Sequence, residues 1–149
     1  MTATDLVAKA KVVFLDFDGP VCSVFSGYPP VRAVSASLRA LEVEGYDPKP
    51  EWLDLEDPHR LITEVADEMP MAARIAEEAL TRSELEAVDT AEITPGVLEL
   101  IDHIEASGRR GAIVSNNSDD SIDRFCDRPD FARSPGLIVG RPKGIPSLM

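Results

Sequence analysis

One apolar segment that leads directly into two aspartates constrains the fold of this chain more than any other feature. The segment Val12 to Leu15 is β-branched and aromatic, and the letters DFDG follow it at Asp16 to Gly19. A short apolar run of this kind predicts a fully buried strand of a parallel sheet. Because side chains alternate along an extended strand, we expect the carboxylates of Asp16 and Asp18 to point the same way.

Two carboxylates held this close form a candidate metal site. Their charges repel, and one of them would tend to bind a proton unless a cation lies between them. Mg²⁺ prefers carboxylate, carbonyl and water oxygens as ligands, and Gly19 permits a tight turn that aims the main-chain carbonyl of Asp18 at such an ion. The pattern therefore predicts Mg²⁺ at Asp16 and Asp18. The alternative is that both residues only form a turn, in which Asp-Gly is common.

A long stretch of helical pattern follows. Apolar residues recur at helical spacing from Val31, after Asp57-Pro58 and from Met71, and no strand pattern interrupts them. An aspartate before a proline is a common helix start. The charged side chains of this stretch show no pattern typical of a site, and His59, like His103 farther along, has no matching metal ligand nearby in sequence. We interpret its glutamates as a solvated helix face, namely Glu77, Glu78, Glu84 and Glu86.

After residue 90 the pattern alternates between helices and short apolar strands. Thr94-Pro95-Gly96 opens a helix. Gly111 to Val114 indicates a second buried strand, capped by Ser115 to Ser118. Leu137 to Val139 indicates a third strand, and a loop rich in Gly and Pro follows it.

The order of these elements predicts an α/β fold with a Rossmann-like parallel sheet. We expect its core to consist of residues 1–30 and 91–149. The stretch 31–90 is too long for a simple connection between two strands, so we interpret it as an inserted small helical cap. Such a cap would cover the carboxyl ends of the strands, where α/β proteins bind ligands.

Charge and cysteine content exclude several classes of protein. The net charge is −12, and 15 Lys and Arg residues are scattered, so we expect neither nucleic acid nor an anionic membrane as a partner. Cys22 and Cys126 are too few for a disulfide scaffold and are predicted to be reduced thiols. No apolar run approaches the ~20 residues of a membrane span, and residues 1–11 lack the apolar stretch of a signal peptide. We expect a cytoplasmic protein.

Two motifs resemble those of the haloacid dehalogenase (HAD) superfamily. The stretch Val13 to Val21 is similar to the first HAD motif, an apolar run followed by Asp-x-Asp-Gly. Ala112 to Asn117 resembles the second, an apolar strand that ends in Ser or Thr, and Thr94 to Val97 resembles the helix start that precedes it. The stretch 31–90 resembles the family's helical cap. This resemblance, which covers nearly the whole chain, implies a HAD-like core and a phosphatase activity.

The resemblance also implies roles for individual residues. Asp16 resembles the nucleophile that forms a phosphoaspartate, and Asp18 the acid that protonates the leaving oxygen and then activates water. The Asp16 carboxylate and the Asp18 carbonyl resemble the ligands of Mg²⁺. Ser115 resembles the phosphate-binding hydroxyl and Asn116 its neighbour at the phosphate, whereas the local sequence equally allows Ser115 to be a plain helix cap.

The C-terminal part departs from the family pattern. The family needs a lysine for the phosphate and one or two acids on a later strand, and no strand pattern follows residue 139. Lys143 is the only lysine in this tail, and we interpret it as a bystander rather than a substitute. The resemblance thus leads us to expect a chain truncated before the C-terminal motifs. The first strand would then have an open edge, which invites self-association.

Two functional hypotheses follow. The first is a Mg²⁺-dependent phosphatase that acts on a small phosphorylated metabolite. An acid at Asp18 favours a phosphatase over a dehalogenase, which needs neither that acid nor Mg²⁺. The alternative is a truncated, catalytically inactive HAD-like domain that binds at most a ligand or another protein.

Overall fold

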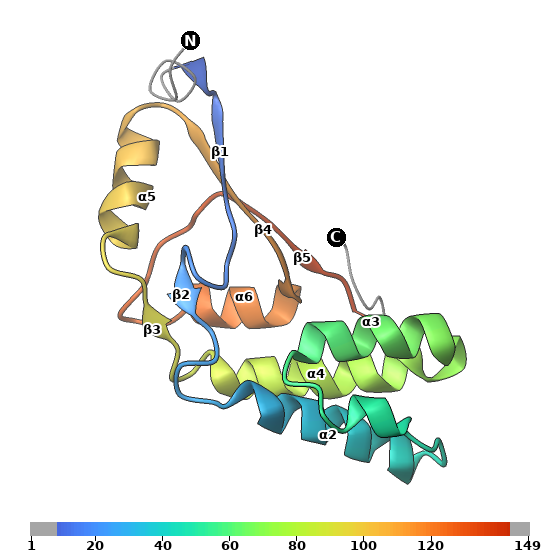
Figure 1. Ribbon diagram of the computed structural model, residues 1–149. Coiled ribbons are helices and arrows are strands. Elements are labelled where there is room, and N and C mark those ends of the chain that lie inside the picture. The colour runs from blue at the N-terminus through green and yellow to red at the C-terminus, as the bar shows by residue number, and fades with distance from the viewer. Residues whose placement is uncertain (1–8, 144–149) are drawn as a thin grey trace.

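A computed structural model describes residues 9–143 of the chain (Figure 1). The strands are β1 (Val12–Leu15), β2 (Cys22–Ser23), β3 (Glu92–Ile93), β4 (Arg110–Ser118) and β5 (Leu137–Arg141). The helices are α2 (Pro30–Val43), α3 (Pro58–Glu68), α4 (Ala73–Ala87), α5 (Val97–Ala106) and α6 (Asp119–Cys126), with short 3₁₀ turns at Pro50–Trp52 and Pro70–Ala72. Within this part of the chain, no helix is both long enough and apolar enough to cross a membrane.

Three of the strands form a parallel sheet in the order β1-β4-β5. Phe14 of β1 lies opposite Ala112 of β4, which in turn lies opposite Leu137 of β5. Strands β2 and β3 form a separate antiparallel pair, which brings together the two ends of the helical stretch between them. The prediction of an α/β fold with a parallel sheet is confirmed.

Strand β1 is not buried on both faces, which corrects the prediction made from its apolar sequence. The Phe14 side chain is 68% exposed, and Leu137, in the same row of the sheet, is 64% exposed. A parallel strand is buried on both faces only where other layers cover both. Strand β1 lies at the edge of the sheet, and the described elements leave this face of Phe14 open to solvent. Self-association through that edge stays a prediction.

Strand β4 is longer than predicted. It continues to Ser118, so the residues 115–118 that were expected to cap it belong to the strand itself. Its pairing with β5 is regular as far as Val114 and irregular from there to Ser118, which lies opposite Arg141. Several polar side chains in this last part are buried, and buried polar groups need hydrogen-bond partners. Helix α4 and Arg141 supply those partners, as described below.

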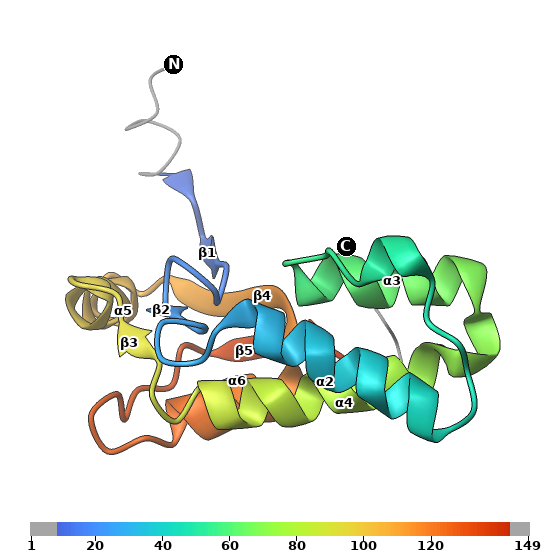
Figure 2. The same cartoon turned by 60° about the horizontal axis from the view of Figure 1, so that its bottom comes forward.

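The three helices predicted between β2 and β3 are present, and we call α2, α3 and α4 the helical block. Helix α2 packs along α4, and α3 contacts both. Figure 2 shows the block gathered at one end of the sheet. Helix α3 begins where the sequence indicates, because the Asp57 carboxylate accepts hydrogen bonds from the main-chain N–H groups of His59 and Arg60. One cluster of buried apolar side chains runs through block and sheet, and their division into two domains stays a prediction.

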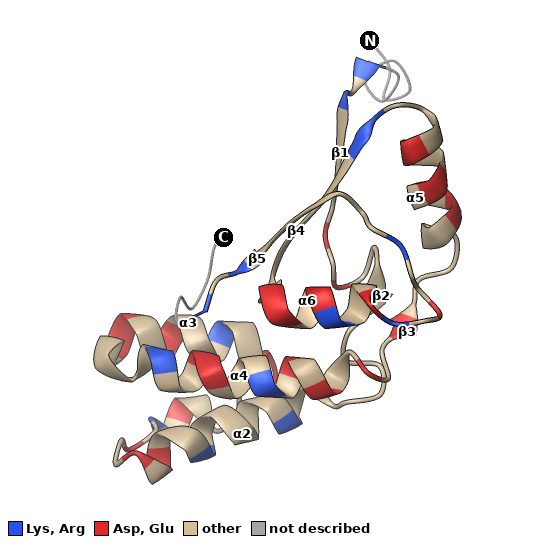
Figure 3. Ribbon diagram, turned by 180° about the vertical axis from the view of Figure 1, so that it is seen from behind, with Lys and Arg blue, Asp and Glu red and all other residues tan. Residues whose placement is uncertain are grey.

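Charged side chains are spread over the visible face of the molecule in Figure 3. Acidic residues are prominent on α5 and α6, while the basic ones are scattered over several elements. Cys22 is buried and Cys126 partly buried, and both thiols are free, as predicted.

Candidate functional site

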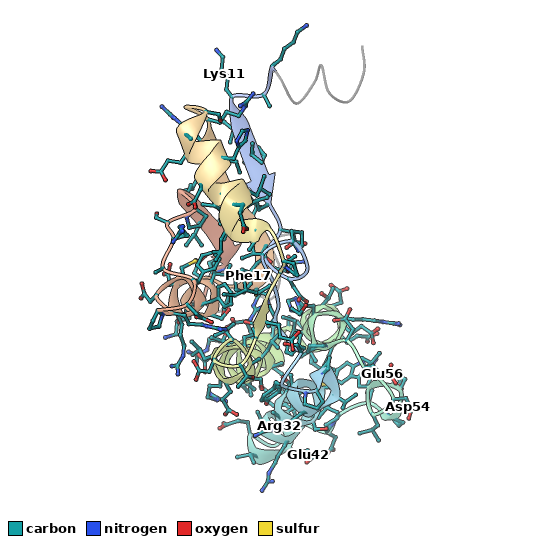
Figure 4. The ribbon with its side chains drawn as sticks, turned by 90° about the vertical axis from the view of Figure 1, so that its left-hand side faces the viewer. Lys11, Phe17, Arg32, Glu42, Asp54 and Glu56 are labelled. Atoms are coloured by element: carbon teal, nitrogen blue, oxygen red, sulfur yellow. The ribbon has the colours of Figure 1, made fainter. Side chains whose placement is uncertain are left out.

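Phe17 fixes the loop that follows β1. Its buried ring packs edge-on against Phe125 of α6, with 5.2 Å between the ring centroids. Its main-chain carbonyl accepts hydrogen bonds from two N–H groups later in the same loop. Figure 4 shows Phe17 at the junction between the sheet and the helical block. Because Phe17 points inward, its neighbours Asp16 and Asp18 lie on the exposed side of the loop.

Hydrogen bonds hold both aspartates in place. Oδ1 of Asp16 accepts a hydrogen bond from the next main-chain N–H at 2.7 Å, and Oδ1 of Asp18 accepts one from the N–H of Val24 at 3.0 Å. Gly19 has a φ of +104°, which only glycine adopts easily, and this agrees with the predicted tight turn. The hydroxyl of Thr94 donates to the carbonyl of Gly19 at 2.5 Å. The loop is therefore held from two sides at the carboxyl end of β1.

The environment of Asp18 favours its protonated form. Its pKa lies above the usual value although the residue is exposed at the surface. The largest cause is that neighbouring protein atoms remove part of the water around the carboxylate, and the negative charges of Asp16 and Glu84 add to the rise. The hydrogen bond from Val24 and the charge of His59 oppose this rise in pKa. The charge of Asp16 thus acts on Asp18, as expected for two carboxylates in one short loop.

The predicted Mg²⁺ site at Asp16 and Asp18 stays a prediction. Among residues 9–143, no three His, Cys, Asp or Glu side chains are grouped so that they could hold a metal ion. Mg²⁺, however, commonly keeps several waters and takes only one or two carboxylates together with phosphate oxygens. The pair of Asp16 and Asp18 fits that use, because a cation beside them would offset the repulsion between the two carboxylates.

Ser115 lies near the end of β4, and its hydroxyl is engaged. The side chain is buried, and its Oγ donates to Oδ1 of Asn117 at 3.1 Å and accepts a hydrogen bond from the N–H of Asn117 at 3.3 Å. Ser115 is not a helix cap, because Ser118 caps α6 by accepting a hydrogen bond from the N–H of Ser121. Asn117 is thus the amide that holds Ser115, and the sequence did not single it out.

The parallel pairing directs these residues to one edge of the sheet. Leu15 at the end of β1 lies opposite Ile113 of β4. Asp16 therefore follows β1 at the same end at which Ser115 continues β4. Carboxyl ends of parallel strands are where α/β proteins bind ligands. The described residues thus place the two aspartates and Ser115 at the end of the sheet that the sequence predicts.

Solved structures identify this architecture. No protein-family model and no curated protein matches the sequence. CbbY from Rhodobacter sphaeroides in complex with phosphate superposes with a TM-score of 0.59 at 18% identity, over 88% of this chain and 63% of that protein. A haloacid dehalogenase-like family hydrolase from Streptococcus pneumoniae superposes with a TM-score of 0.55 at 12% identity, over 93% of this chain and 65% of that protein. The chain has a HAD-like fold.

A hydrolase from Pseudomonas syringae agrees with this assignment. Its TM-score is 0.54 at 18% identity, over 89% of this chain and 60% of that protein. At such identities the likeness shows the HAD-like fold alone. The chain spans 60 to 65% of the length of these three proteins.

An ionic cluster that the sequence did not predict joins α4 to the end of β5. Glu77 and Glu84 of α4 are fully buried, which corrects their interpretation as a solvated helix face. Arg141, at the end of β5, is only 1% exposed and forms ion pairs with both carboxylates. The two glutamates are separated by two helical turns and lie on the buried face that also carries Ala76 and Leu80. That periodicity is the signal that could have revealed their burial.

Three other residues considered in the sequence analysis, His59, His103 and Lys143, lie outside the loop that carries Asp16 and Asp18. Nε2 of His59 is 3.4 Å from Oε1 of Glu84, so His59 is not an isolated histidine. His103 is exposed on α5. Lys143 lines a small pocket beside Arg141, and that pocket includes neither Asp16 nor Asp18. A larger cavity follows the exposed face of β1 and also excludes both aspartates.

Replacing Asp18 with asparagine is expected to stabilise the metal-free HAD-like fold at neutral pH. The folded-state pKa of Asp18 lies above its reference value of 3.8, so folding disfavours the charged carboxylate. The stability that protonated Asp18 contributes is fully present below pH 3.8 and is lost as the pH rises through the folded-state pKa. Asparagine removes that loss and keeps an oxygen acceptor for the N–H of Val24.

Denaturant unfolding in the presence of EDTA measures this effect, with exposed Asp54→Asn as the control. Asp18→Asn should raise the free energy of unfolding near neutral pH and leave it unchanged below pH 3.8. A stabilisation of equal size at both pH values would contradict the assigned cause.

Proposed function

We propose that this protein is a Mg²⁺-dependent phosphatase that hydrolyses a small phosphorylated metabolite through an aspartyl-phosphate. The observation that carries the proposal is the loop after β1, which presents Asp16 at the surface beside Asp18, a carboxyl group with a raised pKa. The HAD-like fold supports it, because the solved CbbY structures contain phosphate in one case and xylulose-(1,5)bisphosphate in another.

In the first half of the reaction, Asp16 attacks phosphorus. The hydrogen bond to its Oδ1 orients the carboxylate, and Oδ2 forms the new P–O bond while the bond from phosphorus to the leaving oxygen breaks. Asp18 donates its proton to that leaving oxygen. A general acid works best when its pKa lies near the working pH, and the raised pKa of Asp18 suits this role.

In the second half, water hydrolyses the aspartyl-phosphate. Asp18, now a carboxylate, accepts a proton from the attacking water, and the P–O bond to Asp16 breaks to release inorganic phosphate. The hydrogen bond from Val24 holds Asp18 in the same position for both steps. The covalent intermediate divides one difficult displacement into two easier ones.

The phosphate needs positive charge, because the chain carries a net charge of −12. The Asp16 carboxylate and the Asp18 main-chain carbonyl would hold Mg²⁺, which would neutralise phosphate charge and help to align the ester. Ser115 and Asn116 would contact the phosphate from the end of β4. The Ser115 hydroxyl donates to Asn117, so it must rotate its hydrogen away from that amide in order to bind phosphate.

A second candidate is an inactive HAD-like module that binds a ligand or a protein. One observation favours it: within residues 9–143, no third metal-ligating side chain joins the two aspartates. The two candidates differ in one property, which is turnover.

Hydrolysis of p-nitrophenyl phosphate separates the two candidates. The purified chain should release p-nitrophenol in the presence of Mg²⁺, should lose this activity in excess EDTA and should regain it when Mg²⁺ is restored. Hydrolysis that is unaffected by EDTA would contradict the metal dependence. If Mg²⁺ supports no turnover at all, the phosphatase proposal fails and the binding module is favoured.

A further inference from the structure

A buried carboxylate in the helical block is bound to the end of the central strand. Glu84 of α4 is completely buried. Nη1 of Arg141 donates to its Oε1 at 3.0 Å, and Nη2 donates to its Oε2 at 2.9 Å. Two parallel hydrogen bonds of this kind fix a carboxylate in orientation as well as in position.

The same carboxylate binds the last residues of β4. The N–H of Ser118 donates to Oε2 of Glu84 at 3.0 Å, and Nδ2 of Asn117 donates to Oε1 at 3.3 Å. Since Oδ1 of Asn117 accepts the hydrogen bond of the Ser115 hydroxyl, an unbroken chain of hydrogen bonds leads from Arg141 through Glu84 to Ser115.

Arg141 adds a second hold on the same strand. Its Nη1 also donates to the main-chain carbonyl of Asn116 at 2.5 Å. The ladder between β4 and β5 is irregular between Val114 and Ser118, so main-chain pairing alone does not define the path of the strand there. The side chains of Glu84 and Arg141 therefore fix the path of β4 where the main-chain pairing does not.

Stability alone does not account for an ion pair in this place. Apolar side chains of similar volume usually serve a protein interior as well as a buried ion pair does. What apolar side chains cannot do is orient an amide and a hydroxyl. The hydrogen bonds of Glu84 end on groups at the edge of the sheet where the candidate phosphate site lies.

We propose that Glu84 and Arg141 are positioning residues, which fix Asn117 and the end of β4 so that Ser115 and Asn116 keep their places at the phosphate. The helical block thereby acts on the site through a side chain that does not touch the substrate. This inference rests on the proposed phosphatase function.

Glu84→Gln tests the proposal, with Glu86→Gln as the matched control on the same helix. Glutamine preserves the shape of Glu84 but turns an NH₂ group towards Arg141. Glu86 is mostly exposed and pairs only at the surface with Arg32. We expect kcat for p-nitrophenyl phosphate to fall about 10²-fold in Glu84→Gln, because small displacements of positioning groups have effects of that size. The KM should stay within about threefold, and Glu86→Gln should match the wild type.

Amide hydrogen exchange supplies a readout that does not depend on turnover. The Ser118 amide donates directly to Glu84 and should exchange faster in Glu84→Gln than in the wild type or in Glu86→Gln. Arg141→Lys keeps the charge, loses the paired geometry and should produce smaller changes in the same direction. It also replaces Glu84→Gln if that variant does not fold.

The outcomes separate the inference from the proposed function. A fall in kcat together with faster exchange at Ser118 supports the inference. Unchanged exchange, or an unchanged kcat, overturns it. If the wild type hydrolyses no ester, the proposed function fails. The inference is then decided by exchange at the Ser118 amide, and it is overturned if Glu84→Gln leaves that exchange unchanged.

Discussion

Asp16→Asn is expected to abolish the hydrolysis of p-nitrophenyl phosphate, with a fall in kcat of at least about 10³-fold. An amide cannot serve as the nucleophile that forms the aspartyl-phosphate, and without that intermediate the reaction loses its stepwise path. The measurement is the initial rate at saturating ester and Mg²⁺, compared between the wild type and the variant.

The design of this variant separates chemistry from folding. Asp16 is exposed, and asparagine keeps an oxygen that can accept the hydrogen bond now made to Oδ1. The variant should therefore unfold at the same denaturant concentration as the wild type. Asp67→Asn, on an exposed position of α3, controls for the loss of one negative charge and should retain full activity. Residual turnover in Asp16→Asn close to that of Asp67→Asn would rule out Asp16 as the nucleophile.

Arg141→Met is expected to lower the free energy of unfolding by about 3–5 kcal/mol. The substitution leaves the carboxylates of Glu77 and Glu84 buried without the guanidinium that forms ion pairs with both. It also removes the donor to the Asn116 carbonyl. Urea unfolding at neutral pH measures the loss.

The matched control for this variant is Arg74→Met. Arg74 pairs with Glu78 at the surface of α4, the helix that also carries Glu77 and Glu84. Such surface pairs contribute only about 0.3–0.5 kcal/mol. Equal losses in the two variants would show that the buried cluster has no special energetic role.

Replacing the whole cluster by apolar residues distinguishes stability from positioning. The triple variant Arg141→Met, Glu84→Leu, Glu77→Leu removes all three buried charges together and should recover most of the lost stability. Activity should stay low in it, because leucine cannot hold the Asn117 amide. Recovery of both properties would indicate that the cluster only stabilises the fold.

The sequence predicted the loop after β1 because the relevant signals are local. An apolar run followed by Asp-x-Asp-Gly specifies a strand end and a turn within a few residues, and Gly19 adopts the expected positive φ. The order of strands and helices likewise followed from short-range periodicity. The exposure of one face of β1 could not be predicted in this way, because it depends on which layers cover each face of the sheet rather than on the strand itself.

The buried cluster could not be predicted because its members are far apart in the chain. Arg141 and Glu84 are 57 residues apart, and a charged residue by itself indicates an exposed position. The length of β4 was missed for the same reason. Asparagine is depleted in strands, so its presence indicates a strand end. Asn117 nevertheless lies within β4, where Glu84 of α4 accepts a hydrogen bond from its side chain.

Asn117, which the sequence analysis did not single out, is the side chain that binds Ser115. Side chains two residues apart share one face of a strand, so Asn117 rather than Asn116 is the natural partner of Ser115. The rule holds only within a strand, and the sequence pattern predicts that the strand ends at Val114.

Trapping the covalent intermediate tests the central claim most directly. The wild-type chain is mixed with p-nitrophenyl phosphate and Mg²⁺, quenched rapidly in acid, digested and examined by mass spectrometry. The account predicts one phosphoryl group on the peptide that contains Asp16, and none on the corresponding peptide of Asp16→Asn. A phosphoryl group on any other residue, or turnover without a phosphorylated protein, would contradict it.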